Sequence, residues 1–177
     1  MMPGCLVLVV GPSGAGKDTL LRLARAALAD DPRYVFPRRL VTRPPSADED
    51  NDEIDEAAFA EGRGAGRFTL SWRAHGLGYA LPETVGRRVA DGHVVVCNVS
   101  RRVVAEARAA GPRVSVVAVT APPEVLAHRI AARGRVQDGD LAARLAREGD
   151  VAADLTILND GAAEEAAARL VAHLRAC

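Results

Sequence analysis

The sequence predicts an α/β fold in which a parallel β-sheet is covered by helices on both faces. Short apolar runs of strand length alternate with segments of helical periodicity, a pattern typical of parallel sheets. The first of these runs leads directly into a glycine-rich loop that opens a helix. The 177 residues suffice for one such domain, and no linker, repeat or low-complexity tract divides them. We therefore expect a single domain over residues 1–177.

The first strand is expected at Cys5–Val10, a continuous apolar run of the kind found in strands buried on both faces. A phosphate-binding loop with the spacing G-x-x-x-x-G-K follows it directly. The ATP-binding residues expected there are Gly11, Pro12, Ser13, Gly14, Ala15, Gly16, Lys17, Asp18 and Thr19. Apolar residues then recur at helical spacing as far as Leu28, so the N–H groups and the dipole of a helix face the bound phosphates.

Lys17 is the only lysine among the 23 basic residues, and it stands where a phosphate-binding loop requires one. A compact ammonium on a flexible stem fits beside the β- and γ-phosphates of a nucleotide, whereas a broad planar guanidinium does not. The Ser or Thr that normally follows this lysine and contacts Mg²⁺ is Asp18, with Thr19 beside it. We expect ATP on the loop and Mg²⁺ held by Asp18 or Thr19, directly or through water.

Further strands are expected at residues 94–97, 114–119 and 155–158, and helices near residues 82–91, 101–110, 123–133, 138–148 and 162–175. Ligands bind such folds at the carboxyl ends of the strands. The stretch 34–79 interrupts the alternation because it is rich in arginine, acidic residues and glycine. We interpret residues 34–81, approximately, as an inserted acceptor-binding segment.

The charge balance and the cysteines limit the partners and the compartment. Acidic and basic residues number 23 each, so no global field favours nucleic acid or an anionic membrane. The apolar N-terminal run is too short for a signal peptide or a membrane span. Cys5, Cys97 and Cys177 lack metal-type spacing, which indicates a reducing compartment. We expect a cytoplasmic protein without nucleic-acid or membrane partners, and either a monomer or a homodimer.

The chain resembles the guanylate kinase-like family of P-loop kinases over nearly its whole length. The supporting motifs, in order, are Gly-Pro-Ser-Gly-x-Gly-Lys, Thr42-Arg43-Pro44, His75-Gly76-x-x-Tyr79, Arg129-x-x-x-Arg133-Gly134 and Asn159 at the end of the last strand. The resemblance implies a P-loop NTPase fold with a lid, here at about residues 129–147.

The residues that would read guanine are missing. By alignment with this family, a small hydroxyl residue becomes Arg39, a Gly-Thr pair becomes Ala80-Leu81, and an acidic residue is replaced around Asn98. A site that pairs with a purine edge needs those groups, because an unpaired buried polar group costs about 1–3 kcal/mol. Arginine and apolar groups suit an acceptor with more negative charge and no base.

A closer resemblance is to the ribose 1,5-bisphosphate phosphokinases of phosphonate breakdown, which make phosphoribosyl pyrophosphate (PRPP) from ATP. It depends on the loop with its unusual aspartate, on residues 38–44, and above all on Ser-Trp-x-Ala-His-Gly-Leu-x-Tyr within residues 68–79. Residues 47–52 depart from this family because they are more acidic and poorer in glycine and histidine. The resemblance implies a phosphorylated sugar as acceptor, with ATP and Mg²⁺.

Phosphoryl transfer depends on positioning and charge neutralisation rather than on a covalent nucleophile. The catalytic candidates, by motif position, are Lys17, Arg129, Arg133 and Arg144, with the arginines directed at the transferred phosphate. The acceptor-binding candidates are Arg38, Arg39, Arg43, Trp72, His75, Tyr79 and Asn98. Arginines outside the motifs, such as Arg22, Arg25 and Arg87, are expected on the solvated surface.

Several of these side chains have a structural alternative. Trp72 and Tyr79 either wall the sugar pocket or belong to the core. His75 either donates to a phosphate or holds a glycine turn. The acidic run 48–56 either helps to hold Mg²⁺ and the acceptor or, as we expect, forms a solvated loop.

Three functions are compatible with these features: a ribose 1,5-bisphosphate kinase, a nucleoside-monophosphate kinase acting above all on guanylate, and a guanylate kinase-like binding module without catalysis. Arg39 and Leu81 argue against the second function. An intact Lys17 and glycine loop argue against the third, because a pure scaffold does not need to hold ATP.

Overall fold

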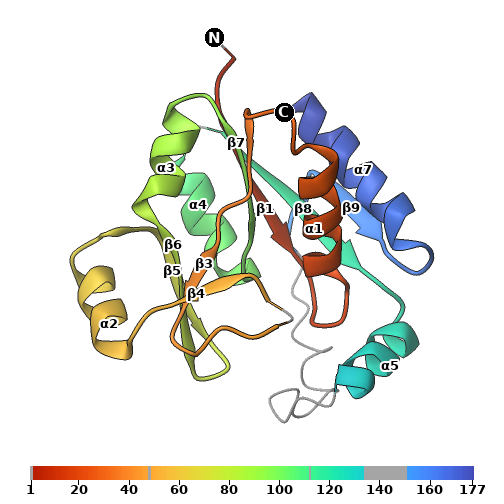
Figure 1. The fold of residues 1–177 in the computed structure, drawn as a ribbon, viewed down its shortest axis with the longest axis horizontal. Helices are drawn as coiled ribbons and strands as arrows, with labels where there is room; N and C mark the ends of the chain where they lie inside the picture. Colours follow the sequence, from red (N-terminus) through yellow and green to blue (C-terminus); the bar gives the residue numbers. More distant parts are fainter. Residues whose placement is uncertain (1, 48, 112, 134–150) are drawn as a thin grey trace.

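The computed structural model describes residues 2–47, 49–111, 113–133 and 151–177, which form two sheets flanked by helices (Figure 1). The central sheet has five strands in the order β2-β7-β1-β8-β9, and every neighbouring pair is parallel. Its strands are β1 (Cys5–Val10), β2 (Tyr34–Val35), β7 (Val94–Asn98), β8 (Val114–Thr120) and β9 (Leu155–Leu158). The predicted α/β class with a parallel central sheet is confirmed.

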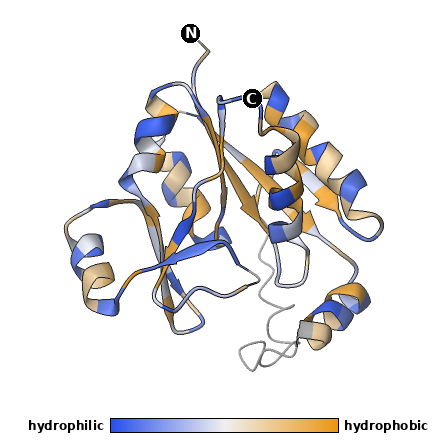
Figure 2. Ribbon diagram, viewed as in Figure 1, coloured by the Kyte–Doolittle hydropathy of each residue, from blue (hydrophilic) through white to orange (hydrophobic). Residues whose placement is uncertain are grey.

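Alternate residues of β1 build two separate cores, because successive side chains of a strand point to opposite faces of the sheet. Val7 and Val9 pack in the cluster that holds residues of α1 (Lys17–Ala27) and α7 (Ala163–Ala176). Leu6 and Leu8 pack in the cluster that holds residues of α3 (Glu83–Ala90) and α4 (Val104–Ala110). Figure 2 shows the apolar sheet between helices with polar outer sides.

A second sheet of four strands lies beside the central one, in the order β4-β3-β6-β5. Its strands are β3 (Arg39–Val41), β4 (Asn51–Glu53), β5 (Phe68–Ala74) and β6 (Leu77–Pro82). The helix α2 (Glu56–Gly64) packs on this sheet through the buried Phe59. The expected inserted segment therefore begins later than Tyr34, which pairs with β7 in the central sheet.

Most of the expected elements recur within one or two residues. The strands at 5–10 and 155–158 agree in both bounds, and α5 spans Pro123–Arg133 as expected. The helix expected at 101–110 opens instead with a 3₁₀ turn at Arg101–Val103 before α4 begins. The helix expected near 138–148 lies outside the described residues. Among the residues described, no helix is both long and apolar enough to span a membrane.

All three cysteines are buried free thiols. Burial raises the pKa of the Cys97 thiol from 9.0 to about 12. The folded protein therefore keeps this proton in a range where the unfolded chain has lost it, so the free energy of unfolding falls as pH rises from 9 to 12.

We predict that Cys97→Ala has a flatter pH dependence than the parent protein across this alkaline range. The small cavity left by the substitution lowers stability equally at every pH, so the slope is the informative quantity. Urea unfolding from pH 8 upward, in the presence of a reductant, measures it. Parallel slopes for the two proteins would contradict the assignment.

Candidate active site

The phosphate-binding loop connects β1 to α1, and its conformation requires glycine. Gly11, Gly14 and Gly16 have φ values of 146°, 84° and 90°, which side-chain-bearing residues rarely adopt. Space is also limiting: a Cβ on Gly16 would lie 2.4 Å from Nδ2 of Asn159, and one on Gly11 would lie 2.0 Å from the carbonyl oxygen of Val119. The loop is therefore fixed by its neighbours as well as by its own sequence.

Lys17 is the first residue of α1, and its side chain folds back over the loop. Its Nζ donates hydrogen bonds to the carbonyl oxygens of Gly11, at 2.6 Å, and of Pro12, at 3.1 Å. Gly16 caps α1 without a side-chain hydrogen bond, so the capping residue itself does not occupy the first N–H groups of the helix. The ammonium, these N–H groups and the helix dipole together form a site for an anion.

Arg129 and Asn159 hold the loop from behind. Arg129, on α5, donates from Nη1 to the carbonyl oxygen of Gly14, at 3.1 Å, and from Nη2 to that of Asn159, at 2.9 Å. Asn159, which is 4% exposed, donates from Nδ2 to the carbonyl oxygen of Ala15 at 2.8 Å. These contacts make Arg129 a support of the phosphate-binding loop. Arg133 ends α5 and Arg144 lies outside the described residues, so the roles of both remain predictions.

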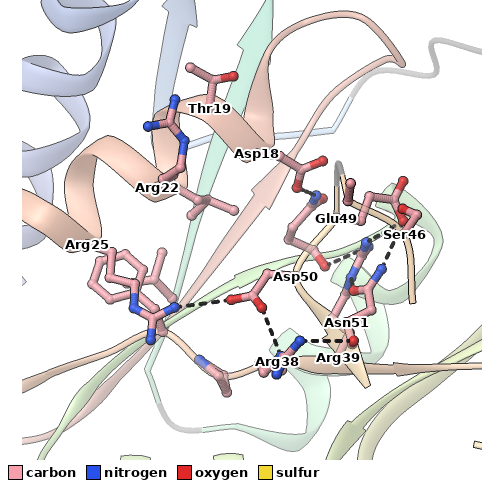
Figure 3. A pocket seen from close by; sticks show the side chains of 16 residues that line it. Asp18, Thr19, Arg22, Arg25, Arg38, Arg39, Ser46, Glu49, Asp50 and Asn51 are labelled. Carbon is pink, nitrogen blue, oxygen red and sulfur yellow. Dashed lines mark hydrogen bonds and ion pairs between the residues drawn. The ribbon is translucent and has the colours of Figure 1, made fainter. Parts of the chain in front are cut away.

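Two cavities meet at the start of α1. The larger one, of about 610 Å³, lies between α1 and the edge of the second sheet (Figure 3). The smaller one, of about 420 Å³, lies between the loop, α5 and the segment after β9. Thr19 lines both cavities. The polar side chains that line the larger cavity are Asp18, Thr19, Arg22, Arg25, Arg38, Arg39, Ser46, Glu49, Asp50, Asn51 and Asn98.

One group of side chains in this larger cavity is centred on Glu49, which is 14% exposed. Its Oε2 pairs with Nη2 of Arg43 and accepts a hydrogen bond of 2.8 Å from Nδ2 of Asn51. Arg39 donates from Nε to Oδ1 of Asn51 at 3.1 Å, and its Nη2 lies 4.0 Å from Glu49. Glu49 was expected in a solvated acidic loop; the structure instead places it between two arginines.

A second group is centred on Asp50, whose carboxylate bridges two arginines. Its Oδ2 lies 3.1 Å from Nη1 of Arg25, and its Oδ1 lies 2.8 Å from Nε of Arg38. Arg38 also lies 3.4 Å from Asp52. Arg25, expected as a solvated surface residue, is half exposed but faces this cavity (Figure 3). Sequence reasoning missed it because nothing local links Arg25 to a residue 25 positions away.

Asn98 connects the loop to the acceptor side. It ends β7, at the carboxyl edge of the central sheet where ligands bind in such folds. Its Nδ2 donates to Oδ1 of Asp18 at 2.9 Å, and its carbonyl oxygen accepts from Nη1 of Arg39 at 3.3 Å. Asp18, the residue that departs from the usual loop motif, therefore faces the cavity that contains the arginines.

The aromatic candidates do not line the larger cavity. Trp72 and Tyr79 are 4% and 8% exposed, their rings stack with centroids 5.5 Å apart, and both belong to a hydrophobic cluster. This placement favours the core alternative for both. Tyr79 also supports the site, because the guanidinium of Arg39 lies over its ring at 5.3 Å from the centroid.

The other candidates of the second sheet are also set apart from the cavities. His75 is exposed in the turn between β5 and β6, with a φ of 53°, and lines neither cavity. Ala80 and Leu81 are fully buried in β6. Of the positions expected to exclude a purine base, Arg39 and Asn98 line the larger cavity and Ala80 and Leu81 do not.

No protein-family model matches this chain. A curated ribose 1,5-bisphosphate phosphokinase PhnN of Methylobacterium radiotolerans is 90% identical over 176 residues, which cover 99% of this chain and 100% of the relative. The enzyme of the same name from Bradyrhizobium diazoefficiens is 53% identical over 98% of this chain and 89% of its own length.

Among solved structures, guanylate kinase from Anaplasma phagocytophilum is similar with a TM-score of 0.73 and 20% identity, over 99% of this chain and 87% of that chain. A gluconokinase from Sinorhizobium meliloti has a TM-score of 0.52 and 18% identity, over 99% and 98% of the two chains. These likenesses confirm the guanylate kinase-like fold.

We predict that ATP binding weakens when the side chain of Arg129 is removed. Arg129→Ala removes charged hydrogen bonds that are each worth about 1.5–3 kcal/mol, so the loop loses its support and the KM for ATP should rise by about tenfold or more. The KM for the phosphoryl acceptor should change much less. Steady-state kinetics with either substrate varied would separate the two effects.

Arg169→Ala is the matched control, because Arg169 is an exposed arginine that also donates to a carbonyl oxygen, that of Thr156, but lies on α7. Equal KM values for ATP in Arg129→Ala and in this control would show that Arg129 does not support the phosphate-binding loop.

Proposed function

The chain belongs to the ribose 1,5-bisphosphate phosphokinase family, and we propose that it transfers the γ-phosphoryl group of ATP to ribose 1,5-bisphosphate, giving PRPP and ADP. The observation that carries this proposal is the junction of two anion sites. The phosphate-binding loop around Lys17 opens beside a cavity lined with arginines, and Asp18 and Asn98 connect the two. A donor and an acceptor that both carry phosphates fit such an arrangement.

ATP fits the loop because its conformation and charge suit a triphosphate. Lys17 already lies against the loop carbonyls, and the start of α1 has no side-chain cap. Mg²⁺ is usually held by one or two carboxylates together with substrate phosphates, and the oxygens of Asp18 and Thr19 are the candidates here. Bound at this place, the ion would neutralise charge on the β- and γ-phosphates.

The acceptor carries its own nucleophile. In forming PRPP, an oxygen of the sugar's 1-phosphate attacks the γ-phosphorus, and the bond to the leaving ADP breaks. A phosphate monoester is largely ionised at neutral pH, so this step needs no general base. The protein has to hold the two anions in line and offset their repulsion, which is the task we assign to Arg38, Arg39 and Arg43.

The alternatives fit the site less well. Guanylate kinase shares the fold, but Arg39 and Asn98 occupy the cavity where a purine edge would need hydroxyl and carboxylate partners. A binding module without catalysis would not need the lone lysine of the chain at the phosphate-binding position. We further propose that the enzyme works in the cytoplasm, on small phosphorylated molecules, as part of phosphonate breakdown.

Lys17 provides the direct test of the loop. Lys17→Ala should abolish phosphoryl transfer while the protein stays folded, because this partly buried loop residue contributes more to phosphate binding than to the core. Lys17→Arg should also be severely impaired, since the guanidinium is too wide for the loop. Turnover of ATP and thermal melting of both variants measure these effects. Full activity in Lys17→Ala would overturn the assignment of the loop.

Acceptor choice provides the second test. Arg39→Ala and Arg43→Ala should each raise the KM for ribose 1,5-bisphosphate by about ten- to a hundredfold, because a charge-assisted contact is worth about 1.5–3 kcal/mol. The KM for ATP should stay nearly constant. Arg87→Ala is the matched control, because Arg87 is an ion-paired arginine on α3 that lines neither cavity, and its KM values should stay close to those of the parent protein.

The deciding quantity is kcat/KM for ribose 1,5-bisphosphate and for GMP under identical ATP and Mg²⁺. We expect GMP to be a poor acceptor at any concentration. A value for GMP as high as that for the bisphosphate would favour a guanylate kinase, and no turnover of either would favour the binding module.

A further inference from the structure

One face of α1 lines the larger cavity along two helical turns. Asp18, Arg22 and Arg25 stand at positions i, i+4 and i+7 and all three line the cavity, as expected for residues on one face of a helix. Leu20 and Ala24 are buried on the other side. At 1.5 Å per residue, Arg25 lies about 10 Å along the axis from Asp18 and the phosphate-binding loop.

The far end of this face carries a pair of arginines, Arg25 and Arg38, of which Arg25 has so far been given no role and Arg38 only a general one in holding the acceptor. Arg25 comes from α1 and Arg38 from the segment that enters β3, and each contacts a different oxygen of Asp50, at 3.1 and 2.8 Å. In this arrangement each guanidinium group contacts its own oxygen of one anion. A phosphate group could be held in the same way, because it offers three such oxygens.

This pair is distinct from the arginine pair nearer the loop. Arg39 and Arg43 share Glu49, and Arg39 is tied through Asn98 to Asp18. Arg25, Arg38 and Arg39 line the cavity, and Arg43 joins them through Glu49. Two arginine pairs thus follow one another along it, each bridged by a carboxylate from consecutive residues of one loop. An acceptor with a phosphate at either end would match both pairs.

We propose that Arg25 and Arg38 bind the phosphate of the acceptor that lies away from the reacting one, the 5-phosphate of ribose 1,5-bisphosphate, and thereby select bisphosphorylated sugars. This inference rests on the proposed function. Asp50 holds the two arginines together in the free protein and yields to the substrate phosphate. The side chains of Arg25, Arg38 and Asp50 are 60%, 48% and 59% exposed. The exchange costs little free energy, because exposed ion pairs are weakly stabilising.

The test compares two acceptors that differ only in this phosphate, ribose 1,5-bisphosphate and α-ribose 1-phosphate, by ADP release. In Arg25→Ala, the ratio of kcat/KM for the bisphosphate to that for the monophosphate should fall by about ten- to a hundredfold, through KM rather than kcat. Arg25→Lys should restore part of the ratio, since it keeps the charge and loses the planar fork.

Arg87→Ala is the control variant, because Arg87 is similarly exposed and ion-paired, with Glu83, but lies on α3 outside the cavity. Asp50→Asn removes the competing charge and should lower the KM for the bisphosphate. If the KM of Asp50→Asn for the bisphosphate rises as far as that of Arg25→Ala, Asp50 is needed to hold the substrate. The proposal that the substrate phosphate displaces Asp50 would then be wrong.

If Arg25→Ala loses activity to the same extent with both acceptors, or keeps full activity with both, the proposal of a second phosphate site is wrong. This holds even if the wild type is an efficient ribose 1,5-bisphosphate kinase. A wild type that does not phosphorylate the bisphosphate would refute the proposed function itself, and the inference with it. Thermal melts of each variant separate these results from loss of folding.

Discussion

Repulsion between anions is the constraint on which this site depends. A kinase that joins ATP to a bisphosphorylated sugar must hold several phosphates within a few ångströms of one another, where like charges repel strongly in a partly dry site. Under the proposed function, the positive groups that would offset this repulsion come from separate parts of the chain: Lys17 and the start of α1, Arg39 and Arg43 from the second sheet and the bend after it, and Arg25 from the cavity face of α1.

The same arginines would repel one another in the free protein, and two carboxylates between them reduce this repulsion. Glu49 and Asp50 each stand between two guanidinium groups, so the cavity is held in shape without a ligand. Arginines gather at this cavity although acidic and basic residues number 23 each in the whole chain. The balance of charge over the whole sequence says little about local fields.

The central sheet and the loop were predictable from the sequence, because their signals are local. A continuous apolar run identified β1, and glycine spacing identified the loop that follows it. The pairing of Arg25 with Asp50 and the partial burial of Glu49 between two arginines were not predictable, since they arise only when the second sheet packs beside α1. For Trp72 and Tyr79 the sequence left two alternatives, and packing between the sheets favours the core. Arg129 was placed at the site by its motif, but its contacts with Gly14 and Asn159 depend on how α5 folds back.

The lone lysine has a practical consequence for the study of this molecule. Because Lys17 carries the chain's one side-chain ammonium and its Nζ lies on the carbonyl oxygens of Gly11 and Pro12, reagents that acylate primary amines have a single side-chain target, within the nucleotide site. Apart from modification of the α-amino group, any acylation of an amine in this protein therefore reports how accessible Lys17 is within that loop. Covalent labelling followed by mass spectrometry becomes a readout of nucleotide occupancy that needs no engineered probe.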